Sequence, residues 1–144
     1  MRIILFVLLT TFSSCGEKEH EFKDSIQNRY WTIASFIENS VDVTQQKTIA
    51  FHGRPFDFST YSHQGFIDWN DKHIGTWTMP ADKPEIYLAM DAGLPILQQN
   101  YSNDTLLQNS LYQLQGLYTI INIDWNELRI EKKDLTSKIA FSTN

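Results

Sequence analysis

Histidine is the side chain best suited to hold a metal ion or to transfer a proton near neutral pH. Neighbouring metal ligands often have the spacing His-x-His or His-x-x-x-His, which places both imidazoles on one face of a strand or a helix. None of the histidines in this sequence has either spacing, so they could share a metal ion only if separate loops met in space. We therefore expect no metal ion and no cofactor. The histidines are His20, His52, His63 and His73.

Carboxylates and nucleophiles give an equally weak catalytic signal. Asp68 and Asp71 flank Trp69-Asn70, and a pair of carboxylates beside an aromatic ring can hydrolyse glycosides. The two aspartates stand where a strand is expected to meet a turn, however, and Asp is a common turn residue. The six glycines are scattered and form no phosphate-binding loop, and the Gly-x-Ser-x-Gly nucleophile motif is absent. We therefore expect a protein that is not an enzyme.

The charge balance argues against a nucleic-acid partner. The 144 residues include 12 basic and 17 acidic side chains, for a formal net charge of −5. Proteins that bind phosphate backbones need clustered Lys and Arg to replace the condensed counterions. The length is sufficient for one domain with a single modest core.

The only cysteine follows a short apolar run near the N-terminus. Arg2 supplies a positive charge, residues 3–12 are mostly apolar, and two serines precede Cys15. A membrane-spanning helix needs about twenty apolar residues, so this run is too short and is typical of a cleavable signal peptide. A single cysteine also cannot form an internal disulfide bond.

The Phe-Ser-Ser-Cys sequence at residues 12–15 resembles the lipobox of bacterial lipoproteins, in which the cysteine thiol receives a diacylglycerol and becomes the new N-terminus. The resemblance implies a lipoprotein signal peptide over residues 1–14 and a membrane anchor on Cys15, whose acyl chains, palmitate among them, would hold the protein permanently. The alternative is an ordinary secretion signal in which Cys15 is a chance residue.

Residues 15–28 then comprise the lipidated cysteine and a polar segment, which we interpret as a flexible tether. The acidic stretch after Cys15 resembles the export signal that sends Bacteroidota lipoproteins to the outer face of the cell. Asp24-Ser25-Ile26 resembles the O-glycosylation sites of the same bacteria, which makes Ser25 a candidate for that modification. We therefore expect an outer-membrane lipoprotein of the bacterial cell envelope, exposed on the cell surface.

The rest of the chain has the pattern of short β-strands. Apolar residues alternate with polar ones in 85–90 and 127–131, as they do in half-buried strands, and Asn70-Asp71-Lys72 can close a hairpin. Eight or nine short strands with short connections should pair as an antiparallel meander that closes into a barrel or stacks. Further strand candidates, chosen for aromatic and β-branched content, are residues 30–37, 48–51, 55–59, 65–69, 74–79, 117–124 and 137–142.

One segment, residues 93–116, does not read clearly as a strand. Leu106, Leu107, Leu111 and Leu114 have the spacing of a short helix of about three turns, with cap residues at 103–105 and a Gly stop at 116. The Gln, Asn and Ser residues between the leucines would also fit a ragged strand, which stays the alternative.

Several stretches together resemble the lipocalin-like lipoprotein domains of Bacteroidota. They are Tyr30-Trp31, Ile74-Gly-Thr-Trp-Thr-Met79, Ile86-Tyr-Leu88, the run 117–123, Leu128-Arg-Ile130 and Ile139-Ala-Phe141. The resemblance implies that residues 29–144 form a small antiparallel meander barrel of about eight strands, with one short helix. It also implies a small apolar ligand inside the barrel.

The candidate ligand contacts are tryptophans and other apolar residues that we expect to face the inside of the barrel. Trp31 would plug one end of the barrel, with its N–H bonded to a carbonyl, and Trp77 would face inward beside Met79. Ordinary core packing explains the same residues, and a fully packed barrel would make the domain a protein-interaction module of an envelope complex. In that case Trp69 and Trp125, which adjoin turns, would be partly exposed and meet the partner together with residues 93–116. The candidate ligand-binding residues are Trp31, Trp77, Met79, Ile86, Leu88 and Met90.

Overall fold

The computed structural model describes residues 24–61, 64–80, 83–90 and 99–143. Within these residues, none of the helices has the length and apolar character needed to cross a membrane. Several expected features lie outside the described residues, so nothing in the fold tests them. They are the signal peptide over 1–14, Cys15, the tether up to residue 23, His20 and His63.

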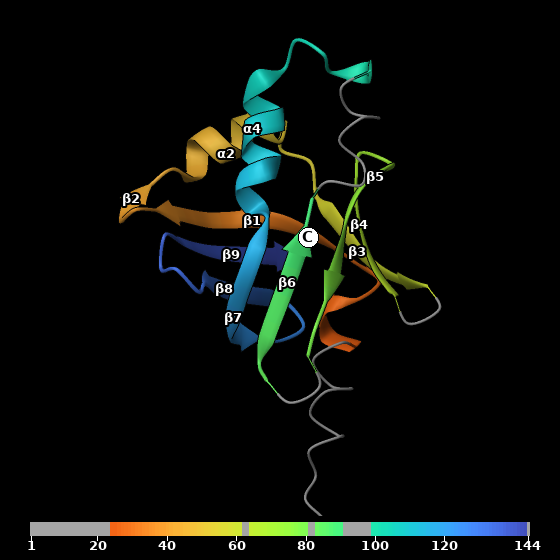
Figure 1. Ribbon diagram of the computed structural model, residues 1–144, viewed down its shortest axis with the longest axis vertical. Coiled ribbons are helices and arrows are strands. Elements are labelled where there is room, and N and C mark those ends of the chain that lie inside the picture. The colour runs from red at the N-terminus through yellow and green to blue at the C-terminus, as the bar shows by residue number, and fades with distance from the viewer. Residues whose placement is uncertain (1–23, 62–63, 81–82, 91–98, 144) are drawn as a thin grey trace, which may run out of the picture.

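Nine strands of the described chain form one antiparallel sheet (Figure 1). Most strands follow from a short run of alternating or aromatic-rich sequence, and most connections are too short for a parallel crossover, whereas the two longest each contain a helix. The strands are β1 (Arg29–Glu38), β2 (Val41–Asp42), β3 (Phe56–Tyr61), β4 (Gln64–Trp69), β5 (Lys72–Thr78), β6 (Glu85–Ala89), β7 (Gly116–Ile123), β8 (Glu127–Lys132) and β9 (Ser137–Thr143).

The sheet closes on itself because β1 pairs with β9 along most of its length. Register pairs run from Trp31 opposite Thr143 to Glu38 opposite Ser137, with an irregularity between Ile33 and Ser35. Strand β1 also pairs with β3, so eight strands form a closed antiparallel meander, and the two-residue β2 adds to one end of β1. The predicted all-β meander barrel of about eight strands is therefore confirmed.

Buried and exposed side chains alternate along the strands, so one face of each strand points into the barrel. In β8, Leu128 and Ile130 are buried, whereas Arg129 between them is exposed. The buried apolar side chains of the described strands belong to one hydrophobic cluster. Gly65 lies opposite Trp77 in the register, and a Cβ added to Gly65 would come within 2.6 Å of the Trp77 ring. The missing side chain thus makes room for a tryptophan inside the barrel.

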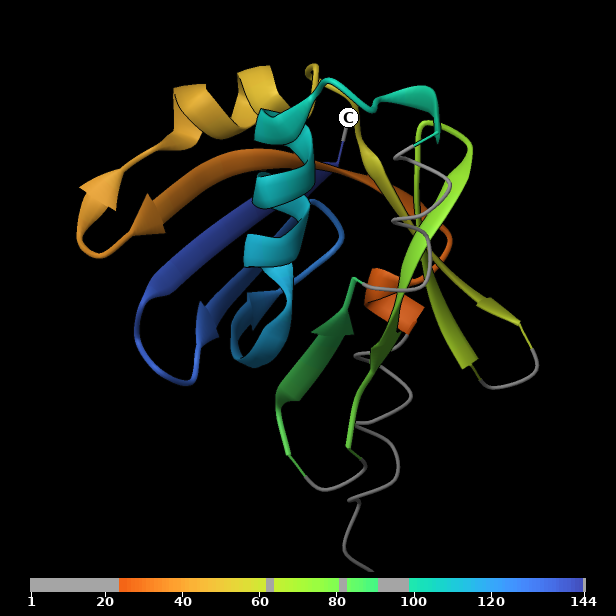
Figure 2. The same cartoon turned by 45° about the horizontal axis from the view of Figure 1, so that its top comes forward.

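Two helices of the described chain, α2 (Thr44–Ala50) and α4 (Thr105–Leu114), lie over one end of the barrel (Figures 1 and 2). Helix α4 confirms the helix predicted within residues 93–116. Leu107, Leu111 and Leu114 point into the core, and Asp104 caps the first turn by accepting from the amide of Leu107. The helix ends at Leu114 with Gln115 as its C-cap, and Gly116, the predicted stop, follows directly with a φ of 150° as the first residue of β7.

Helix α2 corrects one strand prediction. Residues 48–51 were expected to be a strand, but they form the end of this helix and the turn after it. The amide of Lys47 bonds to the carbonyl of Val43, and that of Phe51 bonds to Lys47. Lys47 and Ala50 lie three positions apart and are both buried. Packing at helical spacing therefore outweighs the β-propensity of this short run.

The N-terminal part of the described chain closes the barrel near Trp31. The Trp31 ring is fully buried, and its Nε1–H donates to the carbonyl of Ile26 over 2.9 Å. The predicted bond from the Trp31 N–H to a carbonyl is therefore present. Ile26 itself belongs to the core, so packed residues begin ahead of Arg29, within the segment where the tether was expected to run.

The other tryptophans divide between inside and outside. Trp125 is 72% exposed, as predicted for a residue beside a turn. Trp69 was also expected to be partly exposed, and this prediction is wrong because its ring is only 1% exposed. The reason is that the rings of His52 and Tyr101, from the helical end of the barrel, pack against it.

Candidate functional site

Three rings from distant parts of the sequence meet at the helix-covered end of the barrel. His52 follows α2, Trp69 ends β4, and Tyr101 precedes α4. The ring centroids of His52 and Trp69 are 6.0 Å apart, those of Trp69 and Tyr101 are 5.7 Å apart, and those of His52 and Tyr101 are 6.1 Å apart. These distances and tilted geometries are those of favourable aromatic contacts. We call these residues the three-ring cluster.

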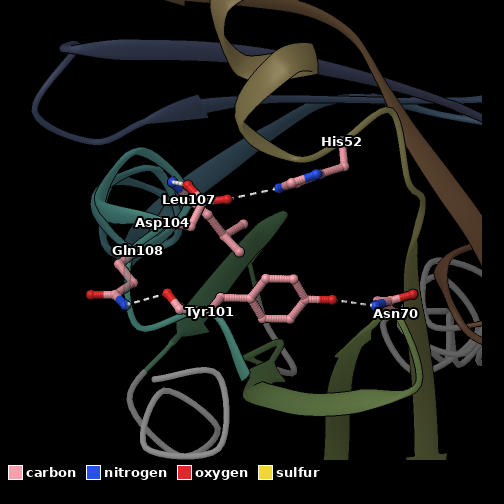
Figure 3. Close-up of polar contacts among 6 residues, drawn as sticks. All are labelled: His52, Asn70, Tyr101, Asp104, Leu107 and Gln108. Atoms are coloured by element: carbon pink, nitrogen blue, oxygen red, sulfur yellow. Dashed lines mark hydrogen bonds and ion pairs between the residues drawn. The ribbon is translucent and has the colours of Figure 1, made fainter. Parts of the chain in front are cut away.

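A contact between His52 and Asp104 connects the cluster to the start of α4 (Figure 3). His52 Nε2 lies 2.8 Å from Asp104 Oδ2, while the other carboxylate oxygen of Asp104 accepts from the amide of Leu107 over 2.9 Å. The Leu107 amide, and then His52, hold the pKa of Asp104 below its ordinary value. Asp104 therefore has two roles, because it caps α4 and it anchors the residue that follows α2.

A second polar link joins the cluster to the β4–β5 turn. Asn70 and Asp71 have positive φ angles of 50° and 59°, which are typical of a two-residue type I′ turn, so the hairpin predicted at residues 70–72 is present. Asn70 Nδ2 donates to the Tyr101 hydroxyl over 2.6 Å, and Gln108 Nε2 donates to the Tyr101 carbonyl over 3.0 Å (Figure 3). The turn, Tyr101 and the first turns of α4 are thereby fixed relative to one another.

Lys47 holds α2 against the barrel and against α4. Its Nζ donates to Gln113 Oε1 on α4, lies 3.9 Å from Glu38 Oε2, and stands 5.0 Å from the ring centroid of Phe36. The side chain is almost fully buried, and this burial lowers the pKa of the amine. The helical cover is thus attached by a few polar links together with the apolar face of α4.

The predicted ligand-binding residues all face the interior. They belong to one core cluster, so the fold brings the predicted set together, although the contacts they make are equally those of an ordinary core. The three-ring cluster was not predicted as a group, since its members are far apart in the sequence. The predicted residues, each at most 8% exposed, are Trp31, Trp77, Met79, Ile86, Leu88 and Met90.

A polar groove of about 400 Å³ lies on the outer face of the barrel. Its floor is one cross-strand row in which Tyr30 is opposite Asp57, Asp57 is opposite Asp68, and Asp68 is opposite His73. His73 Nδ1 lies 3.2 Å from Asp68 Oδ1. Asp71, the other aspartate considered for glycoside hydrolysis, also lines the groove. Among the described residues, no three His, Cys, Asp or Glu side chains converge in a way that could hold a metal ion.

Comparisons with known proteins add little to this description. Neither a family model nor a curated protein matches the chain. A crystal structure of a lipocalin-like protein from Bacteroides uniformis is similar, with 10% sequence identity and a TM-score of 0.48 over 83% of this chain and 99% of the other. The strand pairing, rather than this weak similarity, establishes the barrel.

Substitution of Asp104 should separate its two roles. Asp104→Ala removes both the cap and the partner of His52, and loss of an N-cap alone costs about 1 kcal/mol. Asp104→Asn keeps a good cap without the charge, so we expect a smaller loss of stability, measured by urea unfolding at pH 7. Because the folded pKa of Asp104 is lowered, its contribution is present at neutral pH and is lost as the pH falls through that value. An equal loss in both variants at pH 7 would contradict the capping role.

The opposed carboxylates of the outer groove predict a stabilising substitution. Burial, and then the charge of Asp68, raise the pKa of Asp57, so ionised Asp57 destabilises the fold as the pH rises past its unfolded value. Like charges directly opposite in a sheet cost on the order of 0.5 kcal/mol. Asp57→Asn should therefore raise the free energy of unfolding at pH 7 but not at pH 3. Asp71→Asn, at a turn position in the same groove, is the control and should show little of this pH dependence.

Proposed function

We propose that this chain is a lipid-anchored, non-enzymatic protein of the bacterial cell envelope, exposed on its outer surface, and that its barrel binds a small, largely apolar ligand. The anchor rests on the sequence around Cys15. The proposal of ligand binding rests chiefly on one observation. The barrel is closed and has an apolar lining, and two short helices cover one of its ends.

The lining has the chemistry that such a ligand needs. Small-molecule sites are concave and mostly apolar, with a few polar groups that fix the orientation of the ligand. Eight strands enclose an interior that is filled by side chains or holds one small ligand. Met79 and Met90 supply flexible, polarisable side chains that can adapt to an apolar guest.

The helical cover offers a route into the barrel. Helix α4 presents Leu107, Leu111 and Leu114 to the core, so the apolar contacts made by this helix could be exchanged for contacts with a ligand. The remaining attachments are the local polar links of Lys47 and of the three-ring cluster. Segments that move to admit ligands are drawn from regions with few such attachments.

A second function is favoured by the surface around Trp125, which would suit a protein-interaction module. The Arg29 guanidinium lies 3.9 Å from the centroid of the Trp125 ring, and Arg29 Nη1 donates to the Trp125 carbonyl over 3.0 Å. This contact holds an exposed tryptophan in one place, and Trp and Arg are the residues most enriched at binding hot spots.

Titration of the purified protein with long-chain alcohols, fatty acids and sterols tests ligand binding. We expect a saturable change in tryptophan emission, because Trp31 and Trp77 belong to the lining. Leu88→Phe adds bulk inside the barrel and should weaken binding. Tyr87→Phe, at an outward position of the same strand, is the matched control and should not change binding.

A fully packed barrel would give no saturable change with any of these probes. In that case the interaction function is favoured, and a photo-cross-linker at Trp125 should capture a partner in whole cells. The same cross-linker at Tyr61, which is exposed on another part of the barrel, is the control.

Replacement of Cys15 tests the anchor. The Cys15→Ala variant should lose labelled palmitate and leave the membrane fraction, because the acyl chains supply the membrane affinity. Cys15→Ser gives a second variant without a thiol. If either variant still partitions with membranes and incorporates palmitate, the lipoprotein interpretation is wrong.

A further inference from the structure

Trp69 differs from the other buried tryptophans in its hydrogen bonding. The N–H of Trp31 donates to the carbonyl of Ile26 over 2.9 Å, and that of Trp77 donates to the carbonyl of Ser59 over 3.1 Å. Trp69 Nε1 is buried and has no hydrogen-bond partner among the described residues. A buried donor without a partner is costly and rare in native structures, so each example calls for an explanation.

The neighbours of Trp69 hold its ring but leave its N–H unbonded. His52 and Tyr101 pack their rings against it. His52 Nε2 is engaged by Asp104, and the Tyr101 hydroxyl is engaged by Asn70. The ring is therefore fixed by groups whose polar atoms bond elsewhere.

The register places Trp69 inside the barrel. Trp69 is opposite Phe56, which in turn is opposite Trp31. Residues directly opposite in an antiparallel sheet share a face, so all three face the interior, where Trp31 and Phe56 are also buried. The free donor thus belongs to the apolar lining, at the end covered by the helices.

We propose that the Trp69 N–H is the polar recognition point of the barrel site and that it donates to an uncharged oxygen, a hydroxyl or an ester carbonyl, on an otherwise apolar ligand. This inference rests on the proposed binding function. An indole N–H is a donor only, so the group it recognises must be an acceptor.

The surrounding charges favour a neutral acceptor over a carboxylate. The charged group bonded to the cluster is Asp104, an anion that is already paired with His52. A carboxylate buried at Trp69 would need a cation of its own, because a buried charge without a partner is strongly unfavourable. A hydroxyl or ester oxygen needs only a hydrogen bond, which the indole supplies.

The test compares 1-dodecanol, methyl laurate and laurate at pH 8 as probes of the full chain. We expect the alcohol and the ester to bind at least about tenfold more tightly than laurate, and Trp69→Phe to weaken their binding about fivefold, as the loss of one hydrogen bond would. Trp125→Phe, which removes an exposed indole N–H outside the barrel lining, is the control and should leave both the affinities and the preference for the alcohol over laurate unchanged.

Nuclear magnetic resonance of the wild-type protein gives a second readout that does not depend on the folding of a variant. With ¹⁵N-labelled tryptophan, the Trp69 indole N–H signal should move downfield when dodecanol binds, while the signal of the exposed Trp125 stays in place. If dodecanol binds but neither the Trp69 signal nor the affinity of Trp69→Phe changes, Trp69 is not the recognition point, and the binding function still stands. If laurate binds as tightly as the alcohol, the preference for a neutral oxygen is wrong. If none of the probes binds, the binding function fails together with this inference.

Discussion

The pairing of β1 with β9 is the constraint on which the rest of this structure depends. It joins the first and last strands of the described residues, and it removes the two free edges that an open sheet would leave exposed. Closure also fixes which residues share the interior, since every inward side chain must then fit one enclosed volume. The burial of Trp31 and Trp77, and the space left for Trp77 by Gly65, follow from that enclosure.

Closure of the sheet leaves the two ends of the barrel to be covered by other elements. The residues around Ile26, ahead of β1, cover one end, where the Ile26 carbonyl accepts from the Trp31 indole N–H. Helices α2 and α4 cover the other, where Lys47, His52 and Tyr101 make side-chain links between separate elements. An end whose cover is attached by side-chain links between separate elements opens more readily than a region built from sheet pairing. This difference is why the binding proposal concerns the helical end.

The parts of the fold that the sequence predicts are those governed by local patterns. Alternation in residues 127–131, the Asn70-Asp71 turn and the leucine spacing of α4 each carry their signal within a few residues. Residues 48–51 and the burial of Trp69 were not predictable in this way. The first depends on packing of α2 against the barrel, and the second on rings that lie more than fifteen positions away on either side. Tertiary contacts decide such positions, and propensity does not report them.

The same three strands carry two rows of opposite character, one residue out of step. Trp31, Phe56 and Trp69 face inward, and Tyr30, Asp57 and Asp68 face outward. Each row breaks one rule of stability: the inner row holds an indole donor without a partner among the described residues, and the outer row sets two carboxylates opposite each other. Sequences that otherwise agree at every level tend to break such rules where function requires it. Of the two exceptions, the inner one is the stronger evidence of a functional role. Solvent can screen the outer carboxylates, but it cannot reach a buried indole N–H.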